Sequence, residues 1–148
     1  MQSLKITSFA GMIMILLLLF SSLAWAERWA VSVSVANVRS GPGKHTDILW
    51  EVEKYYPLNV FKKSGQWYHF RDFEGDEGWI HKSLVNNVPT IITKKEKCNI
   101  RSGPGMGFSI AFTVEKGVPF KVITSQGHWI YIEHADGDKG WIFKSLVW

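Results

Sequence analysis

Residues 37–43 read Asn-Val-Arg-Ser-Gly-Pro-Gly, and residues 99–105 repeat them with one change as Asn-Ile-Arg-Ser-Gly-Pro-Gly. The two stretches are 62 residues apart, and this offset holds without a gap to the end of both copies. Over residues 37–85 the alignment gives 23 identities in 49 positions. Repetition at this level indicates an internal duplication, and two copies are too few for a solenoid. The sequence therefore predicts two small domains, residues 27–88 and residues 89–148.

Composition narrows the class of protein. The chain has 148 residues, of which 46% are hydrophobic and 20% charged, with a net charge of +4. This apolar content supports packed cores and excludes a disordered chain. The single cysteine excludes an intramolecular disulfide. The basic residues are dispersed, so no nucleic-acid partner is expected. The five histidines show no metal-ligand spacing, so no metal or other cofactor is expected.

Residues 1–26 have the layout of a secretory signal peptide. Lys5 lies in the positive start, residues 9–20 form an apolar run, and Ala24-Trp25-Ala26 offers a small-residue cleavage site. The run is shorter than the roughly 20 residues that span a bilayer, which favours cleavage after Ala26 over an uncleaved anchor, the alternative. The mature protein is expected to be exported, periplasmic or extracellular, with no stable membrane insertion once the signal is removed.

Each copy reads as a series of short strands separated by turn residues. Alternation of Val and Ser predicts the first strand, and Pro57 is expected to interrupt the chain before the third. Glu74-Gly75-Asp76 is expected to close a hairpin. Five strands in about 60 residues favour an all-β fold of two tandem small barrels. In the first copy the predicted strands are residues 31–35, 48–53, 58–61, 66–71 and 78–81.

The fourth predicted strand separates a core face from an outer face. Tyr68 and Phe70 alternate with Trp67, His69 and Arg71, and the side that carries charge is expected to be only partly buried. The second copy repeats the pattern, with Ile130 and Ile132 facing inward and Trp129, Tyr131 and Glu133 facing outward.

Three motifs occur in the same order in both copies: the Asn-x-Arg-Ser-Gly-Pro-Gly stretch, Gly-x-Trp, and Gly-Trp-Ile. This order resembles the bacterial SH3-like (SH3b) domain family and covers essentially the whole mature chain. The resemblance implies two SH3-like barrels of five to seven strands, non-catalytic and usually in exported or cell-envelope proteins. Members often target a partner enzyme to peptidoglycan or its peptides.

Residues 78–85 also look like the last strand and short 3₁₀ turn of eukaryotic SH3 domains. The groove for proline-rich peptides in those domains uses a Trp that matches Trp67 and a Tyr that matches Trp79. This sequence departs from that pattern because Leu84 replaces the second groove Tyr, and the short Arg-Ser-Gly-Pro-Gly replaces the acidic loop.

Aromatic and histidine side chains of the outer face are candidates for a binding groove, because an amphipathic strip of this kind stacks on peptides and sugars. The tryptophans could instead plug the cores. In the turn where the first copy has Tyr55 and Tyr56, the second copy has only Gly117 and Val118, so the first copy is expected to bind better. The candidates are Trp67, His69, Trp79, Tyr55 and Tyr56 in the first copy, and Trp129, Tyr131 and Trp141 in the second.

The repeated loop motif is expected to be structural. Its glycines supply φ freedom around a fixed proline φ. Its arginines are expected to satisfy loop carbonyls, and the alternative is that they bind a carboxylate. The motif residues are Asn37, Arg39, Gly41 and Pro42, with Asn99, Arg101, Gly103 and Pro104. Cys98 aligns with Ala36, which predicts a small buried slot rather than a nucleophile.

The expected function is non-catalytic binding in the cell envelope, to peptidoglycan or to an extended peptide segment. The alternative is a structural or assembly adaptor in the periplasm that contacts only protein and has no affinity for the wall. No constellation of nucleophile, base and orienting residue is present in the sequence, so no enzyme activity is expected.

Overall fold

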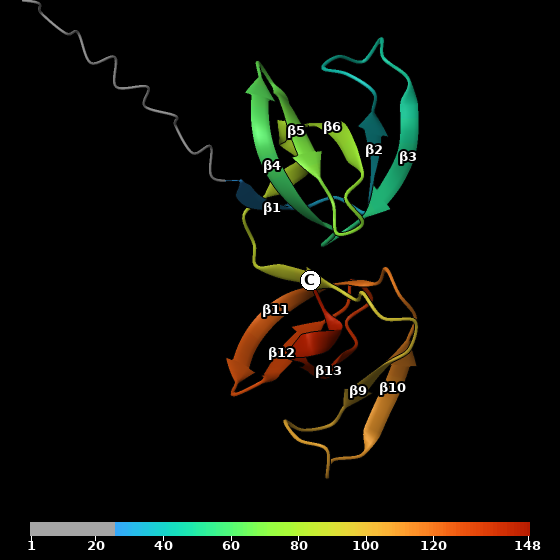
Figure 1. Ribbon diagram of the computed structural model, residues 1–148, viewed down its shortest axis with the longest axis vertical. Helices are drawn as coiled ribbons and strands as arrows, with labels where there is room; N and C mark the ends of the chain where they lie inside the picture. Colours follow the sequence, from blue (N-terminus) through green and yellow to red (C-terminus); the bar gives the residue numbers. More distant parts are fainter. Residues whose placement is uncertain (1–25) are drawn as a thin grey trace, which may run out of the picture.

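The computed structural model describes residues 26–148, and the predicted signal peptide lies outside the described residues except for Ala26. Two antiparallel sheets form two small barrels, one above the other along the long axis (Figure 1). Both sheets and both cores of the described part of the chain are formed by residues 27–148. In the described part of the chain, no helix is long and apolar enough to cross a membrane.

The first barrel is a seven-stranded sheet in the order β3-β2-β6-β5-β4-β1-β7. Its single helical element is a 3₁₀ turn, η1 (Lys82–Leu84), between the last two strands. The strands are β1 (Glu27–Val31), β2 (Val35–Arg39), β3 (Ile48–Glu53), β4 (Pro57–Ser64), β5 (Trp67–Arg71), β6 (Glu77–His81) and β7 (Val85–Asn86).

The second barrel repeats this order as β10-β9-β13-β12-β11-β8, and a 3₁₀ turn, η2 (Lys144–Leu146), again follows the last long strand. The first barrel has two bulges, one in β3 between Ile48 and Trp50 and one in β4 after Val60, and both recur 62 residues on, in β10 and in β11 after Val122. The predicted all-β fold of tandem barrels is therefore confirmed. The strands are β8 (Thr90–Ile92), β9 (Cys98–Arg101), β10 (Ile110–Val114), β11 (Pro119–Gln126), β12 (Trp129–Glu133) and β13 (Lys139–Phe143).

Two strand predictions are wrong. Residues 31–35 are not one strand: β1 ends at Val31, the chain bends, and β2 begins at Val35. The bend is held by a hydrogen bond from the Ser32 N–H to the Leu84 carbonyl (2.9 Å). The third predicted strand, residues 58–61, is longer than expected, and Pro57 does not precede it but is the first residue of β4, opposite Ala30. The first residue of a strand is one of the few sheet positions that tolerate proline, because its missing N–H costs no ladder bond there.

The cores confirm the predicted inward faces. Phe70 and Ile132 are fully buried on equivalent strands, β5 and β12. The large aromatic ring changes strand between the copies, since the first core pairs Leu58 with Phe70 and the second pairs Phe120 with Ile132. The total volume is thus similar, which is the condition under which one backbone accepts two core sequences.

Close strand packing explains the glycine of the Gly-Trp-Ile motif. A Cβ at Gly78 would overlap the Val38 side chain, and a Cβ at Gly140 would overlap Ile100. These glycines therefore let β6 and β13 approach the neighbouring strands β2 and β9.

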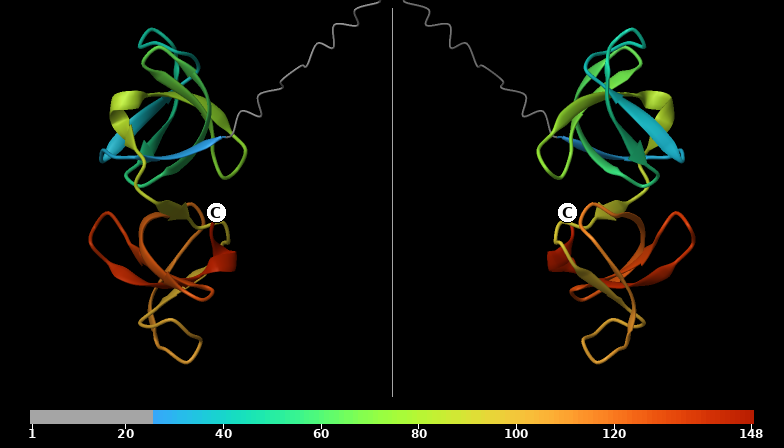
Figure 2. Two further views of the ribbon diagram at one scale, coloured as in Figure 1. Left: turned by 90° about the vertical axis from the view of Figure 1, so that its left-hand side faces the viewer. Right: turned by 90° about the vertical axis from the view of Figure 1, so that its right-hand side faces the viewer.

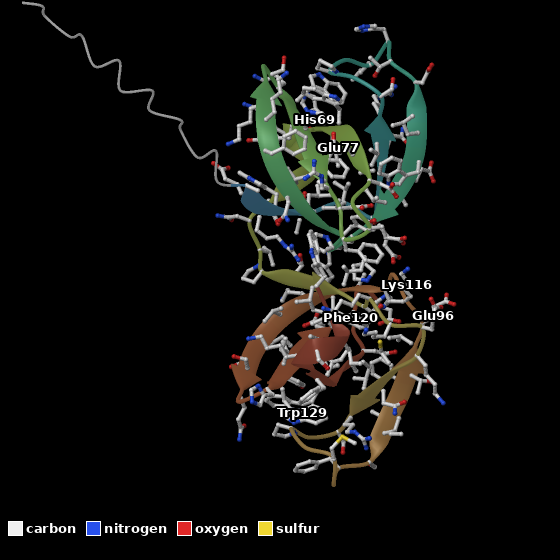
Figure 3. The ribbon with its side chains drawn as sticks, viewed as in Figure 1. His69, Glu77, Glu96, Lys116, Phe120 and Trp129 are labelled. Atoms are coloured by element: carbon white, nitrogen blue, oxygen red, sulfur yellow. The ribbon has the colours of Figure 1, made fainter. Side chains whose placement is uncertain are left out.

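The barrels touch beside the short join that connects them (Figure 2). The guanidinium carbon of Arg28 lies 3.7 Å from the ring centroid of Trp148, and its Nη2 donates to the Trp148 carbonyl (3.0 Å). Lys116 Nζ lies 3.6 Å from the Glu74 carboxylate, at the junction seen in Figure 3. In the join itself, the Pro89 carbonyl accepts a hydrogen bond from the second barrel.

Candidate binding site

The outer face of β5 and β6 carries three of the five predicted binding residues of the first barrel, Trp67, His69 and Trp79. Trp67 and His69 point outward because the residues that alternate with them pack against the core. The register places Trp67 opposite His81 and His69 opposite Trp79. On the other side of β6, Arg39 of β2 lies opposite Trp79. Directly opposed residues share a face, so three strands contribute to one surface.

His69 is the centre of an aromatic stack on this surface. Its ring centroid lies 4.3 Å from that of Trp79 with the planes 6° apart, and 4.4 Å from that of Phe61. The Lys62 ammonium lies 5.9 Å from the centroid of the Trp79 ring. Trp79 is consequently only 8% exposed, although it is not a member of the interior cluster. Trp79 therefore supports the surface from below and leaves little of itself open to a ligand.

The electrostatics of the stack favour a neutral imidazole. Burial lowers the pKa of His69 below its ordinary value of 6.5, and this effect outweighs the Glu77 carboxylate, 3.6 Å from Nε2, which raises it. Figure 3 shows His69 and Glu77 close together on the first barrel. The stack therefore presents an uncharged polar ring at neutral pH.

Trp67 faces a separate pocket of about 410 Å³ between β2 and the 3₁₀ turn η1. The Trp67 and His81 rings meet edge to face, with centroids 5.2 Å apart. The predicted groove is therefore divided, because Trp67 lines the pocket whereas His69 and Trp79 lie in the stack. The lining residues are Val35, Ala36, Asn37, Arg39, Lys44, Glu51, Trp67, His81 and Leu84.

Charges of both signs border this pocket. Lys44 and Glu51 are both exposed, and Trp67, His81 and Leu84 supply partly buried ring and aliphatic surface. A site of this composition suits an extended ligand that carries a carboxylate and an amine beside small apolar groups.

Sequence reasoning missed most of the pocket. Val35, Glu51 and His81 are absent from the predicted binding residues, and Asn37 and Arg39 are predicted in a structural role. The turn that carries Leu84 was visible in the sequence, but the pairing of β2 with β6 was not, because they are about 40 residues apart.

The second barrel places its three candidates in equivalent positions. Tyr131 stacks on Trp141 with centroids 5.0 Å apart and planes at 26°, and Trp129 meets Phe143 at 5.3 Å. None of these residues belongs to the interior cluster. The polar border of the first pocket is not repeated: Met106 replaces Lys44, Thr113 replaces Glu51, and Phe143 replaces His81.

Tyr55 and Tyr56 lie at the other end of β5 from Trp67, near the junction of the barrels. Tyr55 and its equivalent in the second barrel, Gly117, both have a positive φ, of 72° and 86° respectively. Tyr56 packs against the core, and its hydroxyl donates to Asp72 (2.9 Å), which follows β5. Burial raises the pKa of Tyr56. The structure thus does not bring either tyrosine to the Trp67 pocket.

The arginines of the loop motif donate to loop carbonyls. Arg39 Nη1 lies 3.0 Å from the Lys44 carbonyl and 2.8 Å from that of Thr46. Arg101 Nη1 likewise lies 3.3 Å from the Met106 carbonyl and 2.9 Å from that of Phe108. These contacts are those of the expected structural role, and Arg39 adds a pocket wall to it.

Steric contact, rather than φ alone, accounts for the loop glycines. A Cβ at Gly103 would overlap the Phe108 ring, which packs directly on this glycine, and a Cβ at Gly41 would lie 3.0 Å from the Thr46 methyl group. The expected φ freedom is seen at Gly43, whose φ is positive, at 147°.

Cys98 is fully buried in the second core, as its alignment with Ala36 predicts. Burial raises the pKa of its thiol, and Sγ lies 3.5 Å from the Lys95 carbonyl. A buried, protonated thiol is a poor nucleophile.

The chain belongs to the bacterial SH3 domain family, whose family model matches twice, over residues 32–87 and 94–148. The predicted family resemblance is confirmed, and each match falls within one barrel.

Similar proteins include longer chains. Over 140 residues, 86% of this chain, it is 28% identical to YrvJ of Bacillus subtilis, which is named as an N-acetylmuramoyl-L-alanine amidase. Over 52 residues, 34% of this chain, it is 38% identical to LytH of Staphylococcus epidermidis, named as a cell wall amidase. The chain spans only 27% and 18% of these relatives.

Among solved structures, NlpC1 from Trichomonas vaginalis aligns at 17% identity over 93% of this chain and 50% of that chain, with a TM-score of 0.39. An NlpC/P60 family protein from Bacillus cereus aligns at 12% identity over 82% of this chain and 56% of that chain, with a TM-score of 0.40.

Proposed function

We propose that the protein is an exported, non-catalytic module that binds peptidoglycan, with the peptide part of the polymer held in the Trp67 pocket. The observation that carries this proposal is the pocket itself, which is lined both by the aromatic side chains of Trp67 and His81 and by the charged side chains of Lys44 and Glu51. Peptidoglycan peptides present carboxylates, amines and small methyl groups within a few bonds of one another, and each has a partner here. The relatives named as cell wall amidases support the same cellular setting.

A non-catalytic role is supported by the state of the only thiol. Cys98 is buried in the second core and its thiol pKa is raised, whereas a nucleophilic cysteine needs an accessible thiolate. Binding modules of this kind act by holding a protein, or an enzyme joined to it, at the surface of its substrate.

The test is co-sedimentation of residues 27–148 with purified, protein-free sacculi. Glu51→Lys removes the acidic border of the pocket, and we expect it to weaken binding about fivefold, or about 1 kcal/mol. Thr113→Lys is the matched control, because it places the same side chain at the equivalent position of the second barrel. Both positions are exposed, so neither substitution should affect folding.

Two results would contradict the proposal. If Thr113→Lys weakened binding to sacculi as much as Glu51→Lys does, the Trp67 pocket would not be the binding site. If residues 27–148 did not sediment with sacculi at all, the result would favour the protein-only adaptor. One observation favours that second candidate: Met106, Phe108 and Ile110 of the second barrel are 74%, 48% and 48% exposed, and apolar residues exposed together suit a protein contact.

A further inference from the structure

The second barrel contains an apolar pocket of about 510 Å³ that the peptidoglycan proposal does not use. It lies beside the 3₁₀ turn η2, between β8 and the turn that leads into β12. Five of its lining residues are apolar or aromatic: Ile91, Ile130, Phe143, Val147 and Trp148. The other four are Lys94, His128, Lys144 and Ser145.

The first barrel fills the equivalent space with its own side chains. Trp29 and Tyr68, which match Ile91 and Ile130, pack with ring centroids 5.2 Å apart. The Lys63 ammonium lies over both rings, 5.6 Å from Trp29 and 5.0 Å from Tyr68. Two aliphatic side chains in place of two rings therefore leave the second barrel with room that the first does not have.

One wall of the pocket is fixed from outside the second barrel. The Arg28 guanidinium stacks on the Trp148 ring at 3.7 Å and donates to its carbonyl. This contact between the barrels holds the indole at the edge of the pocket, so the apolar surface is formed before any ligand arrives.

The rim of the pocket is basic. Lys94, Lys144 and His128 line it together, and no acidic residue does. Within residues 26–148, neither lysine forms an ion pair with a carboxylate. Two of the three rim groups are specific to the second copy, where Ser32 and Gln66 stand in the first. An apolar floor with a basic rim attracts a ligand with an apolar body and an anionic end.

We propose that this pocket binds a fatty acid, with the acyl chain against Ile91, Ile130 and Val147 and the carboxylate at Lys94 and Lys144. The volume lies within the range of about 300 to 1,000 Å³ found for small-molecule sites. Burying the chain removes apolar surface from water, and the two ammonium groups fix which end stays outside. The site does not depend on the Trp67 pocket, so either proposal can fail alone.

The experiment is a titration of methyl-labelled residues 27–148 with decanoate, followed by NMR. We expect shifts at the methyl groups of Ile91, Ile130 and Val147. The double variant Ile91→Trp/Ile130→Tyr gives the second barrel the ring pair of the first, and it should weaken binding more than about tenfold because the acyl chain loses its space. Thermal unfolding shows whether this variant folds.

A second variant tests the rim and leaves the core untouched. Lys94→Ser, the residue of the first copy, should weaken decanoate binding by about threefold to tenfold. Lys95→Ser is the matched control, because Lys95 is also exposed but does not line the pocket, and it should have little effect.

Four outcomes would overturn the proposal. They are methyl shifts outside the pocket, undiminished binding by a folded Ile91→Trp/Ile130→Tyr variant, equal effects of Lys94→Ser and Lys95→Ser, and binding of decanol as tight as that of decanoate. A peptide with a leucine carboxylate terminus that binds more tightly than decanoate would replace the fatty acid with a peptide end as the occupant.

Discussion

The two barrels share strand order, bulges and 3₁₀ turns, yet they hold their aromatic rings in different places. The first barrel has Phe70 on β5 in its core and fills a second space with Trp29 and Tyr68. The second barrel has Phe120 on β11 in its core and leaves the second space open. The comparison teaches that duplication fixed the backbone, whereas the side chains that fill or border its hollows diverged and produced two different pockets.

The exchange of core rings gives the largest expected effect. Phe70→Ile in the first barrel should lower the free energy of unfolding by about 2 kcal/mol, because it leaves a cavity. Leu58→Phe alone should also destabilise, by about 1 to 3 kcal/mol, through overpacking. The double variant reproduces the pair of the second core and should recover most of the loss. Chemical denaturation measures this cycle, and additive losses would show that the two cores are not interchangeable.

The positive φ shared by Tyr55 and Gly117 gives a smaller effect. Gly117→Ala should destabilise the chain by about 1 kcal/mol, since a side chain is strained in this conformation. Tyr55→Gly should change stability by less than about 0.5 kcal/mol, because relief of strain is offset by the extra freedom that glycine gains on unfolding. Thermal unfolding compares the two, and a neutral Gly117→Ala would contradict the assigned strain.

The smallest effect is the pH dependence that His69 gives to the first barrel. Burial keeps its folded pKa below 6.5, so the unfolded chain binds the proton more tightly. The contribution to stability is therefore complete above about pH 6.5 and is lost as the pH falls through that value toward the folded pKa. His69→Tyr, which introduces the residue of the second barrel, should reduce the loss of stability between about pH 7.5 and pH 5. An unchanged pH profile would assign the dependence to other groups.

Most of the fold could be predicted from local patterns in the sequence. The offset of the copies predicted matching strands, the alternation on β5 predicted the burial of Phe70, and the alignment with Ala36 predicted the burial of Cys98. The prediction of one strand over residues 31–35 is wrong because alternation of residue types cannot reveal a bend. The hydrogen bond that holds this bend, from the Ser32 N–H to the Leu84 carbonyl, joins residues distant in sequence.

The pockets were harder to predict because each depends on contacts between distant parts of the chain. The Trp67 pocket needs β2 beside η1, and nothing in the sequence around Asn37 indicates that neighbour. The pocket of the second barrel is visible only when Ile91 and Ile130 are compared with the rings that replace them in the first. The aligned copies held that signal, but the packing of Trp29 on Tyr68 was needed to interpret it.

The short join and the Arg28–Trp148 contact matter most for a ligand that is a long polymer. When two sites are tethered, the second binding event becomes intramolecular, and its effective concentration depends on how well the tether spans the two sites. Barrels that rest on each other cannot adjust their spacing as barrels on a flexible linker would. A ligand that reached both the Trp67 pocket and the apolar pocket of the second barrel would therefore gain avidity only if its two bound groups lay at that fixed spacing.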